Sequence, residues 1–120
     1  MLIAVTAKSP DPESEVDPRF GRAHYFHIID TETEELTVLE NERGLSLMQG
    51  AGIQTAELLA SRKVDAVLTG HCGPKAFQTL RAAGINVITG VEGKVKNAVE
   101  SFKKGEYKFT DSPDVQSHWE

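Results

Sequence analysis

The hydrophobic pattern at the start of the chain predicts β-strands. Residues 2–6 (LIAVT) and 24–30 (HYFHIID) are rich in β-branched and aromatic side chains, and residues 35–41 (ELTVLEN) alternate apolar with polar positions. The intervening residues 31–34 are polar and few, which favours a tight connection. The strands at 24–30 and 35–41 are therefore expected to pair antiparallel.

The pattern in the second half of the chain alternates between helix and strand. Residues 50–63 and 74–83 show the apolar spacing of helices, with Gly84 placed to cap the second of them. Residues 64–70 (VDAVLTG) and 85–90 (INVITG) are nearly continuous apolar runs typical of buried strands. A third helix is indicated by apolar residues at i, i+3, i+4 and i+7, namely Val95, Ala98, Val99 and Phe102.

This order of elements predicts an α/β fold of three layers. Strands joined through helices are parallel and cross over right-handedly, so one mixed five-stranded sheet with helices on both faces is expected. The arrangement with this order of elements is the ribonuclease H-like one, with strand order 3-2-1-4-5. Residues 1–105 form this domain, whereas residues 106–120 show no clear period and are interpreted as a C-terminal tail.

The predicted strand order creates a crevice beside the first and fourth strands, where the connections leave in opposite directions. The crevice is expected between the loop that follows Thr6, the turn from Gly70 to Pro74, and the turn at Gly90. Residues 8–23 contain several prolines, so the first of these segments is a long surface loop. Long loops in compact domains are often functional.

Length, charge and cysteine content narrow the classes of function. A chain of 120 residues holds one domain, and its net charge of -5 provides no positive field for nucleic acid. The apolar run 1–7 is far shorter than the roughly 20 residues that span a bilayer, and it lacks the features of a secretion signal. A cytoplasmic protein without membrane contact is therefore expected. The single cysteine, Cys72, excludes an internal disulfide and a four-cysteine metal site within one subunit.

The turn Thr69-Gly70-His71-Cys72-Gly73 leaves a buried strand and enters a helix. Backbone N–H groups and the positive end of the helix dipole are expected to face the crevice, which suits an anion. Cys72 is a candidate thiolate ligand there, and His71 offers a nitrogen ligand. The alternative is that Cys72 is a small buried apolar residue and that His71 only serves the loop.

The loop segment DPRFGRA offers two guanidinium groups, those of Arg19 and Arg22. Planar guanidinium groups suit an oxyanion or an anionic sulfide cluster. The alternative is a solvated loop in which Asp17 pairs with one of the arginines. Phe20 is expected to anchor the loop from below rather than to stack on a ligand.

Other candidate residues do not favour an enzyme. His24 and His27 are three residues apart on a strand and point to opposite faces, so they are not expected to hold one ion together. His118 lies in the tail and is assigned no role. The first strand lacks the carboxylate that a ribonuclease H-type nuclease needs. The adjacent His71 and Cys72 point apart, which disfavours a cysteine–histidine hydrolase.

Four segments, DPRFGRA, GAGIQTAELL, DAVLTGHCGPKAF and AAGINV, occur in this order within residues 1–105. In order and spacing they resemble the dinitrogenase iron–molybdenum cofactor biosynthesis family. That family includes NifX-type carriers, the carboxy-terminal part of some NifB proteins, and the orange molybdenum–copper protein. The resemblance implies a ribonuclease H-like domain that binds a metal–sulfur cluster and lacks the nuclease carboxylates.

The family's motifs fall on two groups of residues. Its loop motif matches Asp17, Arg19, Phe20, Gly21 and Arg22, and its strand-to-helix turn matches Thr69, Gly70, Gly73, Pro74, Ala76 and Phe77. His71 and Cys72 occupy positions where the family is variable. The leading hypothesis is a non-enzymatic carrier for an anionic iron–molybdenum, molybdenum–copper or iron–sulfur cluster, with Cys72 and His71 as further metal ligands.

A second hypothesis assigns the chain to a different class of function. It is an interaction module for an Mrp-type P-loop ATPase or another cluster-assembly enzyme, and it holds no cluster. The edge strand 35–41 or the tail around Trp119 offers the docking surface. A thiol-dependent or phosphate-handling enzyme is the third hypothesis. The sequence leaves open the metal, the donor and acceptor proteins, and the oligomeric state.

Overall fold

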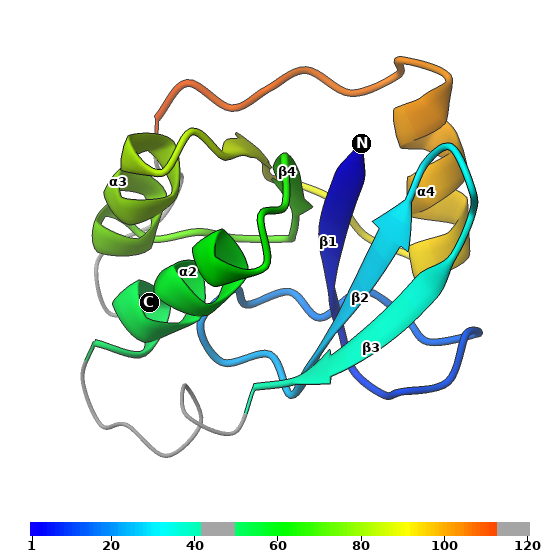
Figure 1. Cartoon of the computed structure of the whole chain (residues 1–120), viewed down its shortest axis with the longest axis horizontal. Coiled ribbons are helices and arrows are strands. Elements are labelled where there is room, and N and C mark those ends of the chain that lie inside the picture. The colour runs from blue at the N-terminus through cyan, green and yellow to red at the C-terminus, as the bar shows by residue number, and fades with distance from the viewer. Residues whose placement is uncertain (42–49, 113–120) are drawn as a thin grey trace.

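The computed structural model describes residues 1–41 and 50–112 and contains the predicted mixed sheet. The strand order is β3-β2-β1-β4-β5, which confirms the expected topology. Helices cover both faces of the sheet (Figure 1), so the α/β fold of three layers is confirmed as well. The elements are β1 (Leu2–Ala7), β2 (Tyr25–Asp30), β3 (Leu36–Glu40), α2 (Ala51–Ser61), β4 (Ala66–Leu68), α3 (Pro74–Ala82), β5 (Asn86–Ile88) and α4 (Val95–Lys103).

The direction of the strands changes at β1. This strand pairs antiparallel with β2 and parallel with β4, and β4 pairs parallel with β5. β4 and β5 are shorter than the apolar runs 64–70 and 85–90 predict. The pairing of β4 with β1 and with β5 is limited to three residues in each strand. Val64 and Ile85 remain buried outside the strands, so these apolar residues serve packing instead of strand pairing.

Two apolar clusters, one on each face of the sheet, hold the helices in place. On one face α2 and α3 pack over residues that include Ala4, Phe26, Leu59, Val67, Phe77 and Leu80. On the other face α4 packs over residues that include Ile3, Val5, Ile29, Leu68, Val95 and Val99. The alternation along β1 and β4 explains this division, since successive side chains of a strand point to opposite faces.

Ion pairs join both ends of α4 to neighbouring loops. Lys96 Nζ lies 2.7 Å from a carboxylate oxygen of Glu13, and Lys103 Nζ lies 2.6 Å from a carboxylate oxygen of Glu34. The hydrogen bond from Lys96 lowers the pKa of Glu13, and the one from Lys103 lowers the pKa of Glu34. The same contact with Glu34 raises the pKa of Lys103. Both ends of the helix are therefore tied to the loops while the carboxylates are ionised.

We expect these pairs to make the stability of the protein fall in acid. A carboxylate whose pKa is lowered in the folded state contributes stability above its ordinary value of 4.5, and this contribution is lost as pH falls through the lowered pKa. Urea unfolding from about pH 6 to about pH 3 measures the loss. The double variant Glu13→Gln/Glu34→Gln should show a shallower pH dependence. An unchanged dependence in this variant would contradict the assignment.

The first residues of the predicted tail follow the edge of β5. Thr110 N–H donates to Val87 O at 2.6 Å, and its hydroxyl accepts a hydrogen bond of 2.9 Å from Thr89 N–H. This part of the tail therefore covers an edge that an isolated domain would leave open. His118 and Trp119 lie outside the described residues, so the docking role considered for the tail around Trp119 stays a prediction.

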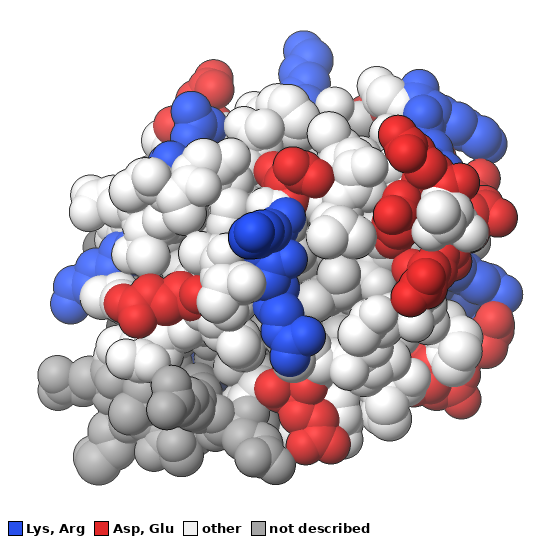
Figure 2. All heavy atoms as spheres, viewed as in Figure 1, with Lys and Arg blue, Asp and Glu red and all other residues white. Residues whose placement is uncertain are grey.

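The helices of residues 1–41 and 50–112 include none with the length and apolar character needed to cross a membrane. On the face shown in Figure 2, Lys and Arg side chains are interspersed with Asp and Glu. This face carries no extended positive patch.

Candidate functional site

The three loops that the sequence predicted to lie together meet where β1 and β4 end. An isolated parallel bridge joins Arg19 to His71, with Phe20 N–H donating to His71 O at 3.2 Å. Gly90 N–H donates to Gly70 O at 2.8 Å and so ties the turn after β5 to the turn after β4. The arginine loop, residues 17–23, thus lies directly against the strand-to-helix turn.

The contact between this loop and the turn depends on a glycine. A Cβ on Gly70 would lie 2.7 Å from Pro18 O and 2.8 Å from Pro18 Cα. His71 N–H donates to that same carbonyl at 2.8 Å, which locks the two segments together. Real Cβ atoms do not approach backbone this closely, so only glycine permits the observed packing.

Buried threonines hold the start of the loop. Thr6 Oγ1 donates to Asp17 O at 2.7 Å and makes a 3.1 Å hydrogen bond with Thr69 Oγ1, while Asp17 N–H donates to Thr6 O at 2.9 Å. Both threonine side chains are fully buried. Thr6 and Thr69 come directly after the paired residues Val5 and Leu68 of β1 and β4. The register of these two strands therefore fixes the point at which the loop leaves the sheet.

A buried asparagine that sequence reasoning missed holds the end of the loop. Asn41 Nδ2 donates to Gly21 O at 3.2 Å and to Ala23 O at 2.9 Å, and its Oδ1 accepts a hydrogen bond of 3.2 Å from Thr55 Oγ1. The side chain therefore links β3, the arginine loop and α2. Its position at the end of an alternating strand gave no signal for this role, because the partners are distant in sequence.

Phe20 anchors the middle of the loop, as expected. Its side chain is 1% exposed, and its ring stands edge-on to Phe26 with centroids 5.7 Å apart. Phe20 belongs to the apolar cluster under α2 and α3. The ring is thus part of the core and not a platform on the surface.

The two arginines of the loop differ in their surroundings. Arg19 is exposed, and within the described residues its guanidinium forms no hydrogen bond or ion pair. Asp17 Oδ1 accepts a hydrogen bond of 3.0 Å from the backbone N–H of Arg19, which shapes the turn instead of neutralising the guanidinium. Arg22 is half-buried. The loop therefore presents at least one positive charge beside the turn.

The two candidate ligands of the turn, His71 and Cys72, differ in their exposure. His71 is half-buried, whereas Cys72 is fully buried, with its Sγ 3.8 Å from Gly73 O. Gly73 is the N-cap of α3 and Pro74 occupies the first turn, so the helix begins directly after the turn that the arginine loop contacts. The amide of His71 is engaged by Pro18. The helix start thus contributes its dipole, while the sulfur packs with the core.

The histidines of the second strand lie apart. His24 is exposed beside Tyr25, whereas His27 is 1% exposed within β2. Among residues 1–41 and 50–112 no three His, Cys, Asp or Glu side chains are grouped so as to hold a metal ion. The grouped features of the site are a guanidinium, a helix start and rigid backbone.

Solved structures share this architecture along nearly the whole chain. The apo form of the orange protein from Desulfovibrio gigas is 43% identical, with a TM-score of 0.93 over 95% of this chain and 96% of that one. A candidate NifB protein from Thermotoga, solved by NMR, is 32% identical, with a TM-score of 0.82 over 95% and 97% of the two chains. An uncharacterised protein of Methanocaldococcus jannaschii is 28% identical over 99 residues, which are 80% of this chain and 83% of that one.

The family model described as dinitrogenase iron–molybdenum cofactor matches residues 1–105. The match spans every described helix and strand and includes the arginine loop and the strand-to-helix turn. The resemblance inferred from the sequence motifs is thereby confirmed, and the chain belongs to the dinitrogenase iron–molybdenum cofactor family.

Proposed function

We propose that the protein binds and carries an anionic metal–sulfur cluster during cofactor assembly, without catalysing a reaction itself. The cluster is cargo that rests at the arginine loop and the strand-to-helix turn. The observation that carries the proposal is the backbone bridge between Arg19 and His71, which holds the residue that bears the exposed guanidinium against the turn that leads into α3. Membership in a family named for such a cofactor supports the same conclusion.

In this proposal the cluster is bound by positively charged groups that the fold already holds in place. A guanidinium donates several hydrogen bonds in a fixed plane, and a helix start adds a partial positive charge. The bonds from Thr6, Thr69 and Asn41 keep the loop in place before the cargo arrives, so little ordering is required on binding. The sulfide atoms of an iron–molybdenum, molybdenum–copper or iron–sulfur cluster are the acceptors that this arrangement suits.

Direct ligation by the turn is a further part of the proposal. His71 is half-buried and can reach cargo at the crevice. Cys72 Sγ is enclosed by the core, so its use as a ligand requires the turn to move away from the sheet. Thr69, Gly70 and Gly73 contribute the shape of the turn and not side-chain ligands.

The test compares two arginines with the same change of charge. Metal-free protein is titrated with tetrathiomolybdate and copper(I), and the visible absorption that co-elutes with protein is measured. Arg19→Ala is expected to weaken binding about tenfold, as the loss of one charge-assisted contact implies. Arg62→Ala, at the C-cap of α2 and thus away from the crevice, should bind as the unmodified protein does.

Equal weakening by both variants, or colour that stays with the small-molecule fraction, would overturn the proposal. A protein that stays colourless and yet captures an Mrp-type P-loop ATPase would favour the second candidate function. That candidate, an interaction module, is favoured by the exposed Leu36 and Val38 on the edge strand β3.

A further inference from the structure

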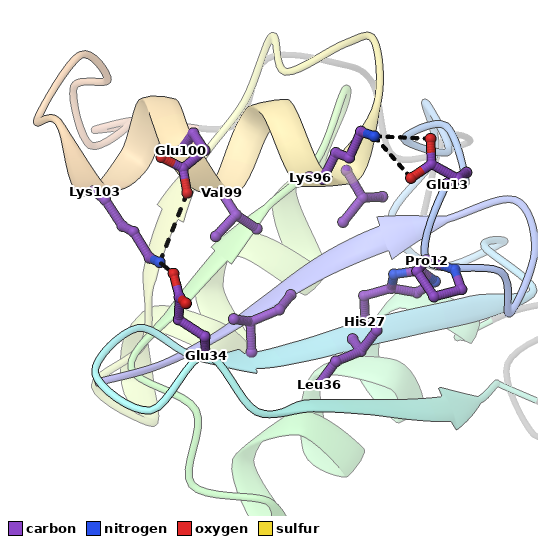
Figure 3. A pocket seen from close by; sticks show the side chains of 11 residues that line it. Pro12, Glu13, His27, Glu34, Leu36, Lys96, Val99, Glu100 and Lys103 are labelled. Atoms are coloured by element: carbon purple, nitrogen blue, oxygen red, sulfur yellow. Dashed lines mark hydrogen bonds and ion pairs between the residues drawn. The ribbon is translucent and has the colours of Figure 1, made fainter.

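A cavity of about 220 Å³ lies between α4 and the edge formed by β2 and β3. It is on the face of the sheet that α4 covers, whereas Phe20 and Cys72 belong to the cluster on the other face. Figure 3 shows side chains of α4 pointing toward those of the two strands across this space. The cavity is therefore separate from the proposed cluster site.

Apolar side chains form most of its walls. Ile29 and Leu36 come from the strands and Val95 and Val99 from α4. These apolar side chains disfavour contact with a strongly hydrated group, because they would strip water from it without replacing the lost hydrogen bonds.

One polar side chain, His27, faces this cavity from within the sheet. The residue is 1% exposed, and its Nε2 lies 2.9 Å from Ser9 O. A carbonyl oxygen only accepts, so Nε2 carries the hydrogen and Nδ1 of the neutral ring is an acceptor.

The described residues supply no protein partner for this Nδ1. Every fully buried side-chain nitrogen or oxygen that the structure describes has a partner, so Nδ1 is not fully enclosed, and His27 lines this cavity. A hydrogen-bond acceptor thus lies beside the apolar side chains of the strands, in a cavity whose ends carry charged side chains.

Charged groups at the two ends of the cavity form ion pairs with one another. Lys96 pairs with Glu13 at one end, and Lys103 pairs with Glu34 and Glu100 at the other (Figure 3). Each lysine thus has a carboxylate partner. The lysines therefore offer no unpaired positive charge to an anionic ligand, whereas Glu34 and Glu100 share a single lysine.

We propose that this cavity binds a small uncharged molecule with an apolar body and one hydroxyl or amide N–H group. That group donates to His27 Nδ1, and the apolar body lies against Ile29, Leu36 and Val99. A cavity of about 150 Å³ accommodates benzene, so the present volume holds a single ring with a short substituent. The site is distinct from the one that receives the metal–sulfur cargo.

Three probes of similar shape test the proposal on the full chain. Phenol has a donor, anisole has only an acceptor, and benzene has neither. Each is titrated while the backbone amide resonances of α4 and β2 are followed by NMR. We expect phenol to bind about fivefold to tenfold more tightly than benzene, as one net hydrogen bond implies, and anisole to show no such advantage.

Neighbouring residues of β3 supply a matched pair of variants. Leu36 and Val38 are 37% and 36% exposed on the same face of the strand, but only Leu36 lines the cavity. Leu36→Trp is expected to block binding of all three probes. Val38→Trp introduces the same side chain on the same face at a position that does not line the cavity, so it should leave binding unchanged.

His27→Phe keeps a ring in place and removes the acceptor, so phenol should then bind no better than benzene. If this variant fails to fold, the comparison of the three probes on the unmodified protein remains decisive. Equal affinity for phenol and benzene would overturn recognition by His27. The absence of saturable shifts, or equal effects of both tryptophan variants, would overturn the binding site.

Discussion

Phe20→Ala is expected to lower the free energy of unfolding by about 3–5 kcal/mol, the usual cost of removing a fully buried aromatic ring. The ring is 1% exposed and packs edge-on against Phe26. Its loss leaves a cavity beneath the arginine loop, whose two ends are held by hydrogen bonds to Thr6 and Asn41. The surroundings are therefore unable to collapse fully into the space.

Denaturant unfolding of the variant and of the unmodified protein measures this loss. Phe20→Leu is the control, because it keeps most of the apolar volume and should cost less than half as much. A cost below about 1 kcal/mol for Phe20→Ala would contradict the anchor role, since exposed substitutions rarely exceed that range. Cargo binding should weaken in Phe20→Ala even under conditions where the protein stays folded.

Gly70→Ala is expected to separate the arginine loop from the turn. The added Cβ would lie 2.7 Å from Pro18 O, and both contacting groups are backbone, so one segment has to move. Overpacking of this kind costs about 1–3 kcal/mol. The hydrogen bond from His71 N–H to Pro18 O should break, and its loss should appear as faster hydrogen exchange of the His71 amide.

Gly105→Ala is a control that distinguishes the effect of a close contact from the effect of backbone strain. Gly105 has a φ of 72° and open space where a Cβ would stand. Gly105→Ala is thus expected to cost about 1–2 kcal/mol through its left-handed conformation alone. It should leave cargo binding and the exchange of the His71 amide unchanged. Protection of that amide in Gly70→Ala would show that the loop does not depend on the close approach.

Phe20→Ala and Gly70→Ala both disturb the packing that holds the arginine loop against the core. The loop that carries Arg19 has little regular structure of its own, so its position is set by a buried ring, a close backbone approach and a few buried hydrogen bonds. The ring of Phe20 and the side chains of Thr6 and Asn41 are buried. Stability and cargo binding are therefore expected to change together in Phe20→Ala and Gly70→Ala, and independently in Arg19→Ala.

Local patterns in the sequence were sufficient for the elements and their order. The apolar runs predicted each described strand, and Gly84, with φ of 80°, ends α3 where a left-handed residue was expected. The order of elements matched the ribonuclease H-like arrangement, and its sheet order 3-2-1-4-5 is the one that the structure contains. The motifs in residues 17–23 and 69–77 carried enough order and spacing to indicate the family.

Contacts between distant residues were decided only by the tertiary structure. Sequence reasoning left Cys72 either as a thiolate ligand at the turn or as a small buried apolar residue, and the packing of α3 on the sheet encloses its sulfur. The role of Asn41, the course of Thr110 along β5 and the cavity at His27 depend on partners many positions away, which periodicity does not encode. Periodicity reports which face of an element is buried, whereas the identity of the opposing atoms is fixed only when the elements pack.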